Sequence, residues 1–189
     1  MLTAQQEQAK YNQLWGMPQY REWSPGMDNV ERFIDIVKPK PYASLLDIGC
    51  GSGKAGLEFE KRGLGLDIWW LDITDAGLDP AVPRERFFSS TLWNWALPRD
   101  FDYGFCCDVM EHIPPEFTML ALYRIIAACK VSWFQIALIP DNCGKLIGET
   151  LHLTVRPFTW WRDRFLDLGA DIIEARDLLD TGLYVVRRP

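Results

Sequence analysis

The sequence predicts an α/β fold: a doubly wound, mostly parallel, seven-stranded sheet with an antiparallel strand near the C-terminus and helices on both faces. Three observations support this prediction. Apolar segments of strand length alternate along the chain with segments of helical periodicity. A glycine-rich turn joins the first of these strands to the helix that follows it. At 189 residues the chain has room for one such domain and not for two ordinary ones.

Residues 1–41 are predicted to form a helical leader, followed by a core over residues 42–189 of the same single domain. Two helices are predicted in the leader, over residues 3–16 and 28–37, because apolar residues recur there at helical spacing. The prolines and glycines of residues 16–26 predict a loop between them.

Strands and helices are predicted to alternate through the core. Apolar runs predict the strands, which cover residues 43–48, 67–73, 86–89, 102–107, 131–138, 171–175 and 183–187. Helical spacing predicts the helices, which cover residues 53–62, 116–129 and 159–168. We expect Trp69 and Trp70 to point to opposite faces of the sheet and Trp133 to lie in the core. In such folds ligands bind at the carboxyl ends of the strands, where the strand order reverses.

The turn Asp47-Ile-Gly49-Cys-Gly51-Ser-Gly53 follows a predicted strand and opens a predicted helix. Glycines allow a tight turn and a close approach of the backbone to a ligand, and the start of a helix offers free N–H donors. A phosphate-binding P-loop is excluded, because Ile48 and Ala55 stand where it needs glycine and a hydroxyl residue. Residues 51–56 also match G-x-G-x-x-G, which leaves a dinucleotide cofactor as a competitor.

This turn, with an acid two residues before its first glycine, resembles motif I of the class I S-adenosylmethionine-dependent methyltransferases, whose core is Rossmann-like. Asp72 matches the acid that holds the ribose hydroxyls in that family, and residues 101–115 (FDYGFCCDVMEHIPP) resemble the family's fourth-strand block. The resemblance implies S-adenosylmethionine as the cofactor. The residues it assigns to cofactor binding are Asp47, Gly49, Cys50, Gly51, Gly53, Asp72, Ile73, Thr91, Leu92 and Asp108.

The chain departs from the family after the third strand. Family members often have an acid there that holds the adenine amino group, whereas this chain has Ser90 and Thr91. We expect adenine to meet the backbone at Leu92 and the ring of Trp93 instead. An acid like Asp72 also occurs in nicotinamide enzymes, but Asp47 and the short chain favour the methyl donor over a dehydrogenase.

Two histidines are the candidate catalytic residues, because an acceptor hydroxyl or amine carries a proton that a general base can remove. His112 follows the fourth strand, and His152 lies in the region after the fifth. No metal is the first expectation. As an alternative, the order of Asp108, Glu111, His112 and His152 resembles the metal site of methyltransferases that act on terminal RNA ribose. A divalent ion there would hold two neighbouring hydroxyls and lower the pKa of one.

The acceptor is expected to be selected by the leader and by residues 142–161. The leader sequence LWGMPQYREWSPG resembles that of methyltransferase-like proteins of bacteria and tailed phages. It forms either a lid over the cofactor or a packing helix with an exposed loop; as a lid, Tyr11, Trp15, Tyr20 and Arg21 would face the cofactor. Trp93, Trp95, Trp160 and Trp161 are expected nearer the cleft, where they could stack on a ring-shaped acceptor, although core packing is the favoured role for most of them.

The composition indicates which kinds of molecule the protein can bind and where it is expected to be found. The net charge of −6 argues against broad nucleic-acid binding. No apolar run is long enough to span a bilayer, no signal peptide opens the chain, and five cysteines show no zinc spacing, which together predict a cytoplasmic protein. We therefore expect a small-molecule acceptor methylated on O or N. Two alternatives stay open: a nucleic-acid methyltransferase acting on ribose or base, and a catalytically silent binding module of the same fold.

Overall fold

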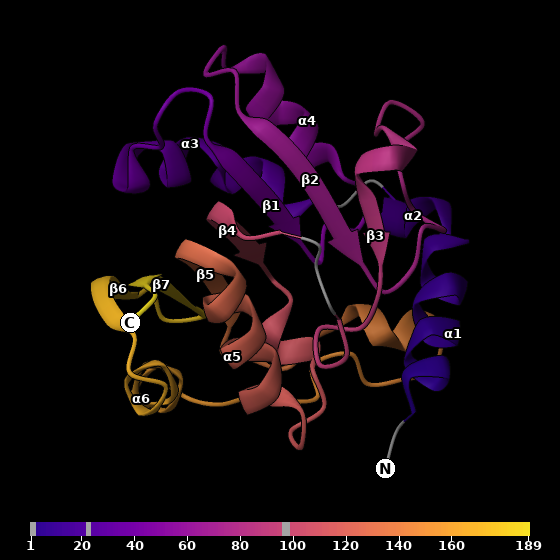
Figure 1. The fold of residues 1–189 in the computed structure, drawn as a ribbon. Helices are drawn as coiled ribbons and strands as arrows, with labels where there is room; N and C mark the ends of the chain where they lie inside the picture. Colours follow the sequence, from indigo (N-terminus) through magenta and orange to yellow (C-terminus); the bar gives the residue numbers. More distant parts are fainter. Residues whose placement is uncertain (1–2, 22–23, 96–98) are drawn as a thin grey trace.

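The strands form one seven-stranded sheet in the order β3-β2-β1-β4-β5-β7-β6 (Figure 1). The computed structural model describes residues 3–21, 24–95 and 99–189. The first five strands run parallel to one another, and β7 is antiparallel to both of its neighbours. Their bounds are β1 Ser44–Ile48, β2 Asp67–Asp72, β3 Phe87–Ser89, β4 Phe101–Cys107, β5 Cys129–Ala137, β6 Asp171–Asp177 and β7 Thr181–Arg187. The predicted fold class is confirmed.

Helices cover both faces of this sheet. In the view of Figure 1, α3 (Pro25–Val37) and α4 (Lys54–Lys61) lie above it, and α5 (Thr118–Ala128) and α6 (Phe158–Asp167) lie below it. Each helical layer buries its own apolar core against the strands. The core under α3 and α4 contains Phe33, Phe59, Trp70, Phe105 and Trp133, and the core under α5 and α6 contains Leu122, Ile125, Phe134, Trp161 and Phe165. Each such side chain contributes about 1.5–3 kcal/mol through burial.

The tryptophans predicted to alternate do so. Trp70 is fully buried in the core under α3 and α4, whereas Trp69 packs against the opposite core. Trp133 is also fully buried, as predicted. Period-two alternation along a strand is therefore enough to place all three rings.

The leader differs from its prediction in one segment. Helix α1 (Ala4–Trp15) lies where expected, and its first turn is closed by a capping box between Thr3 and Gln6. The predicted loop, however, contains a short helix, α2 (Pro18–Arg21), and α3 begins at Pro25 instead of Asp28. The loop prediction was wrong at these two points because proline at a first helical position starts a helix rather than breaking one.

The sheet reverses its strand order at β1. From β1 the chain proceeds through α4 to β2 and β3 on one side, and then crosses to β4 on the other side. The loops after β1 and β4 therefore diverge and leave a crevice at the carboxyl ends of these strands. Three short 3₁₀ helices lie in the connections, at Arg84–Arg86, Met110–His112 and Cys143–Leu146. In the part of the chain that the structure describes, no helix combines the length and apolar character that crossing a membrane requires.

Gly56 allows α4 to approach β2 closely. A Cβ atom at this position would lie 2.2 Å from Nε1 of Trp70, which itself donates a hydrogen bond to the Gly53 carbonyl at 3.0 Å. The Gly56 N–H also donates to the Asp47 carboxylate at 3.0 Å, which ties the helix to the end of β1.

We predict that Gly56→Ala destabilises the protein. In an open helix this change would stabilise the fold by roughly 0.5–1 kcal/mol, whereas here the added methyl must displace the buried Trp70 ring, at a cost of about 1–3 kcal/mol. Urea unfolding followed by tryptophan fluorescence measures the difference. An increase in the free energy of unfolding would contradict the close packing of α4 on β2.

Candidate active site

A cavity of about 450 Å³ lies at the crevice where the strand order reverses. Its wall is made by α1 and by the segments that follow β1, β2, β3, β4 and β5. A volume of this size is usual for small-molecule and cofactor sites. Every predicted site residue except Gly53 lines it: Asp47, Gly49, Cys50, Gly51, Asp72, Ile73, Thr91, Leu92, Asp108, His112 and His152.

The three glycines of the turn all adopt left-handed backbone conformations, with φ values of 65°, 55° and 75° at Gly49, Gly51 and Gly53. A side chain would also meet neighbours, since a Cβ at Gly49 would lie 2.4 Å from Val109. Gly53 has a different place from the other two. It caps the start of α4 and packs against Val82, so it shapes the turn from outside the cavity.

Two buried carboxylates flank this turn. Asp72 accepts hydrogen bonds from the N–H groups of Gly51 at 2.8 Å and Thr74 at 3.1 Å. Burial raises the pKa of Asp72 to about 6, although these N–H donors act in the opposite direction. Burial likewise raises the pKa of Asp47 to about 7, while its bond from Gly56 opposes the rise. Asp47 fastens the turn to α4, and Asp72 sits at the end of β2 on the cavity wall.

Helix α1 packs directly over the glycine turn. The Trp15 ring lies so near Gly51 and Gly77 that a Cβ would come within 2.7 Å and 2.2 Å of it. Gln8 adds a hydrogen bond to the Ile73 carbonyl at the end of β2, at 2.8 Å. Tyr11, Trp15 and Tyr20 line the cavity. Arg21, which was expected to face the cofactor, instead bonds the Trp15 carbonyl, so it supports the turn after α1 from the side.

The two histidines lie together, with ring centroids 4.8 Å apart. The Tyr11 hydroxyl holds His112 and lies 2.9 Å from its Nδ1. Burial, with a smaller contribution from the charge of His152, lowers the pKa of His112 to about 3. The ring is therefore neutral near pH 7, and it shares one proton position with the Tyr11 hydroxyl.

His152 is held differently. Its Nδ1 lies 2.7 Å from the Ile139 carbonyl oxygen, and because a carbonyl only accepts, Nδ1 carries the proton. Nε2 then keeps its lone pair. The backbone N–H groups of Leu151 and His152 both donate to Asp141, at 2.9 and 3.2 Å, so this carboxylate fixes the start of the histidine segment.

Glu111 lies beside the histidines and is fully buried. Its Oε1 accepts a hydrogen bond from the Ala137 N–H at 3.0 Å, but Oε2 has no hydrogen-bond partner among the described residues. One ligand atom from each of Glu111, His112 and His152 lies within 4.8 Å of the other two. The structure thus brings together three of the four residues named for the metal alternative, and Asp108 lies outside this close group.

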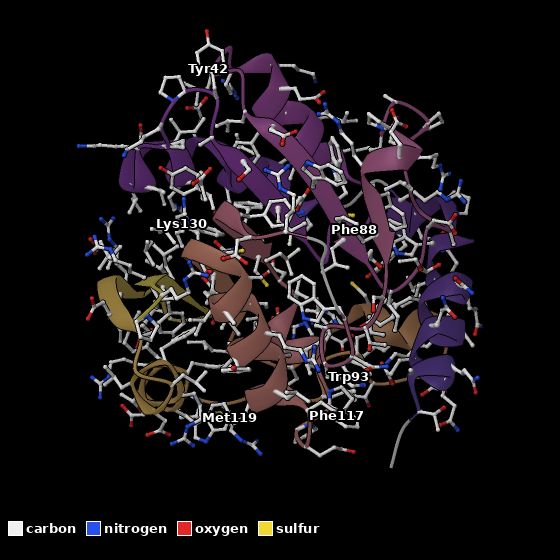
Figure 2. All side chains as sticks on the ribbon, in the orientation of Figure 1. Tyr42, Phe88, Trp93, Phe117, Met119 and Lys130 are labelled. Atoms are coloured by element: carbon white, nitrogen blue, oxygen red, sulfur yellow. The ribbon has the colours of Figure 1, made fainter. Side chains whose placement is uncertain are left out.

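The aromatic residues expected near the cleft divide into two groups. Trp93 lines the cavity and stacks on Phe117 with ring centroids 4.9 Å apart, as the neighbouring labels in Figure 2 show. Trp95, Trp160 and Trp161 do not line it and instead pack in or against the core under α5 and α6, as expected for most of these rings. The reason is that Trp161 points from α6 into the sheet core, while Trp160 packs on it at right angles and lies under Arg156 and Arg164.

Some residues that lie at the site were not predicted from the sequence. Asp141 is the clearest example, because it supports His152 through backbone N–H groups alone, for which no side-chain motif exists. The expected acceptor region, residues 142–161, contributes Asn142, Cys143, Leu151 and His152 to the cavity wall and nothing after His152.

Comparison with known proteins agrees with this geometry. No family model matches the chain. A curated relative, trans-aconitate 2-methyltransferase of Rhodopseudomonas palustris, is 24% identical over 158 residues, which cover 80% of this chain and 57% of the relative. This chain therefore spans little more than half of that protein's length.

Solved structures share the fold. Magnesium protoporphyrin IX methyltransferase of Synechocystis, with bound S-adenosylhomocysteine (SAH), superposes with a TM-score of 0.64 at 17% identity, over 86% of this chain and 81% of that one. The small RNA methyltransferase HEN1 superposes with a TM-score of 0.65 at 15% identity, over 85% of this chain and 25% of that one. The strand order and these similarities show that the chain has the fold of class I S-adenosylmethionine-dependent methyltransferases, and its curated relative is a methyltransferase.

Proposed function

We propose that the protein transfers a methyl group from S-adenosylmethionine to an oxygen or nitrogen of a small-molecule acceptor. One observation carries the proposal: the glycine turn with Asp72 and the histidine pair open into the same 450 Å³ cavity. A cofactor held at the turn and an acceptor held at the histidines would share one enclosed space. Much of the rate acceleration in methyl transfer comes from such positioning.

The residues at the turn suit this cofactor. The Asp72 carboxylate is placed to accept hydrogen bonds from neighbouring ribose hydroxyls, and the left-handed glycines keep the backbone free of side chains beside it. Thr91, Leu92 and Trp93 form the wall that we assign to adenine, and Asp108 lies beyond the end of β4. When bound, S-adenosylmethionine supplies an electrophilic methyl group on a sulfonium sulfur.

His152 is the residue that we assign as general base. Its Nε2 lone pair is free, since Nδ1–H is occupied by the Ile139 carbonyl. His112 suits this role less well, because burial lowers its pKa to about 3 and the Tyr11 hydroxyl holds its Nδ1. We therefore assign His112, with Tyr11, the task of positioning the acceptor wall and α1.

A small acceptor suits this site better than a nucleic acid. Helix α1 covers the glycine turn, so a polymer would need the leader to move away. The net charge of −6 also gives weak attraction for a polyanion. Within the leader, residues 1–41, we assign α1 the role of a lid over the cofactor for the same reason, whereas α3 packs on the sheet.

Calorimetry with SAH, the demethylated cofactor, tests the cofactor site. We expect binding by the wild-type protein and a loss of about tenfold or more in affinity for Asp72→Asn, because hydrogen bonds to a charged carboxylate are lost. Asp75→Asn is the matched control, since Asp75 is exposed, pairs with Arg84 at 2.9 Å and lies three residues along the chain. Binding of NAD with no binding of SAH would instead favour a dehydrogenase.

Radiolabelled methyl transfer into fractionated cell extract tests the class of acceptor. We expect label in the low-molecular-weight fraction, and a loss of about 100-fold or more for His152→Ala with unchanged affinity for SAH. Label confined to RNA would support the nucleic-acid alternative. SAH binding with no label in any fraction would support a silent binding module.

Nitrogen NMR of the imidazoles tests the two histidine assignments, because the chain has only two histidines. We expect the His112 signals to stay those of a neutral ring between about pH 5 and 8, since burial keeps its pKa near 3. Because the unfolded chain binds this proton near pH 6.5, the contribution of His112 to stability falls as the pH drops below that value. His152→Gln assigns the remaining signal, and titration of that signal near pH 6.5 would show that His112 is not buried as described.

A further inference from the structure

The cavity wall is acidic throughout. Seven carboxylic side chains line it: Glu7, Asp47, Asp72, Asp108, Glu111, Asp141 and Asp180. No Lys or Arg lines it over residues 3–21, 24–95 and 99–189, and the seven other residues of the chain include neither type. An anionic acceptor would therefore enter a negative cavity with no cation to receive it.

Several of these acids already have donors. Glu7 pairs with Lys10 at 2.6 Å, Asp72 accepts two backbone N–H groups, and Asp141 accepts three. Over the residues that the structure describes, Glu111, which lies beside the histidines on the cavity wall, has a single donor, the Ala137 N–H.

Glu111 is the clearest case of an acid with an oxygen that lacks a hydrogen-bond donor among the described residues. The residue is fully buried, and within the described part of the chain its Oε2 has no donor. A buried polar atom without a partner costs about 1–3 kcal/mol, so such atoms in folded proteins usually face a ligand or water. His152 belongs to the same group of three side chains, and in the neutral ring its Nε2 is also an acceptor. A group with two N–H donors could serve both residues.

The three side chains are close enough for one small group to contact more than one of them. One ligand atom from each of Glu111, His112 and His152 lies within 4.8 Å of the others. Acceptors placed about 2.8 Å from one tetrahedral nitrogen lie about 4.6 Å apart, so an ammonium group fits this spacing.

We propose that Glu111 and His152 form a subsite for a protonated amine, and that the methyl acceptor of this enzyme is an amine rather than an acid. Two N–H groups of the ammonium ion donate to Glu111 Oε2 and His152 Nε2, and the nearby Asp108 adds negative charge. Transfer of one ammonium proton to Nε2 frees the nitrogen lone pair, and the neutral amine is then the nucleophile. The role as acceptor rests on the proposed methyl transfer, whereas binding of an amine does not.

Three probes of one shape and different charge test this subsite: benzylamine, benzyl alcohol and benzoate. Each is titrated into the full-length protein with and without SAH, and the two imidazoles are followed by nitrogen NMR together with calorimetry. We expect benzylamine to shift the His152 Nε2 signal and to bind roughly tenfold or more tightly than the other two. Benzoate binding as tightly as benzylamine would overturn the proposal.

A cavity variant and a matched surface variant test whether Glu111 is responsible for amine binding. Glu111→Gln is expected to weaken benzylamine binding by about tenfold or more, while Glu149→Gln, an equal charge change at an exposed residue outside the cavity wall, leaves it unchanged. If Glu111→Gln does not fold, as judged by circular dichroism, Asp108→Asn replaces it with the same expected direction. Unchanged benzylamine binding in the folded cavity variant would contradict the assignment.

A titration with a metal ion tests whether this site binds a metal instead of an amine. Zn²⁺ or Mn²⁺ that perturbs both imidazoles at one equivalent, with no response to benzylamine, would show a metal site and overturn the amine subsite. Benzylamine binding without any SAH binding would support the subsite while contradicting the proposed cofactor, so the two failures are distinguishable.

Discussion

The site depends on one close contact, the packing of the glycine turn between β1, β2 and α4. Asp47 accepts the Gly56 N–H, and the Trp70 indole donates to the Gly53 carbonyl, so the helix cannot move away from the strands without breaking both bonds. Because a side chain at Gly56 would overlap Trp70, glycine is required there for packing alone. The left-handed glycines then send the backbone past the end of β1 and leave Asp72 facing the cavity.

The leader covers one side of the cavity with helix α1. Tyr11 bonds His112, Gln8 bonds the end of β2, and Trp15 covers Gly51, so three successive turns of α1 contact three different parts of the core. Together these contacts bury His112, and burial lowers its pKa to about 3. The proposed difference in role between the two histidines therefore depends on where α1 docks.

Electrostatics separates the two ends of the cavity. Near the glycine turn, backbone N–H groups satisfy Asp72, and near the histidines, Glu111 has one oxygen without a partner among the described residues. Burial, with a further contribution from Asp108, raises the pKa of Glu111 well above its ordinary value, although the N–H of Ala137 opposes the rise. The proposed amine subsite would place a positive charge where burial now disfavours the negative charge of this carboxylate.

The sequence by itself determined the fold class, the glycine turn and many of the residues that line the cavity. These features depend on local patterns: alternation of apolar residues defines strands, and glycine spacing defines a turn. The tertiary structure alone decided which atoms are free. It excluded Gly53 from the cavity, moved Trp160 and Trp161 into the α6 packing, brought in Asp141, and left Nε2 of His152 and Oε2 of Glu111 unpaired. The physical reason is that a hydrogen-bond partner is chosen by contacts between segments far apart in the chain, such as Tyr11 with His112, and no local pattern encodes such a contact.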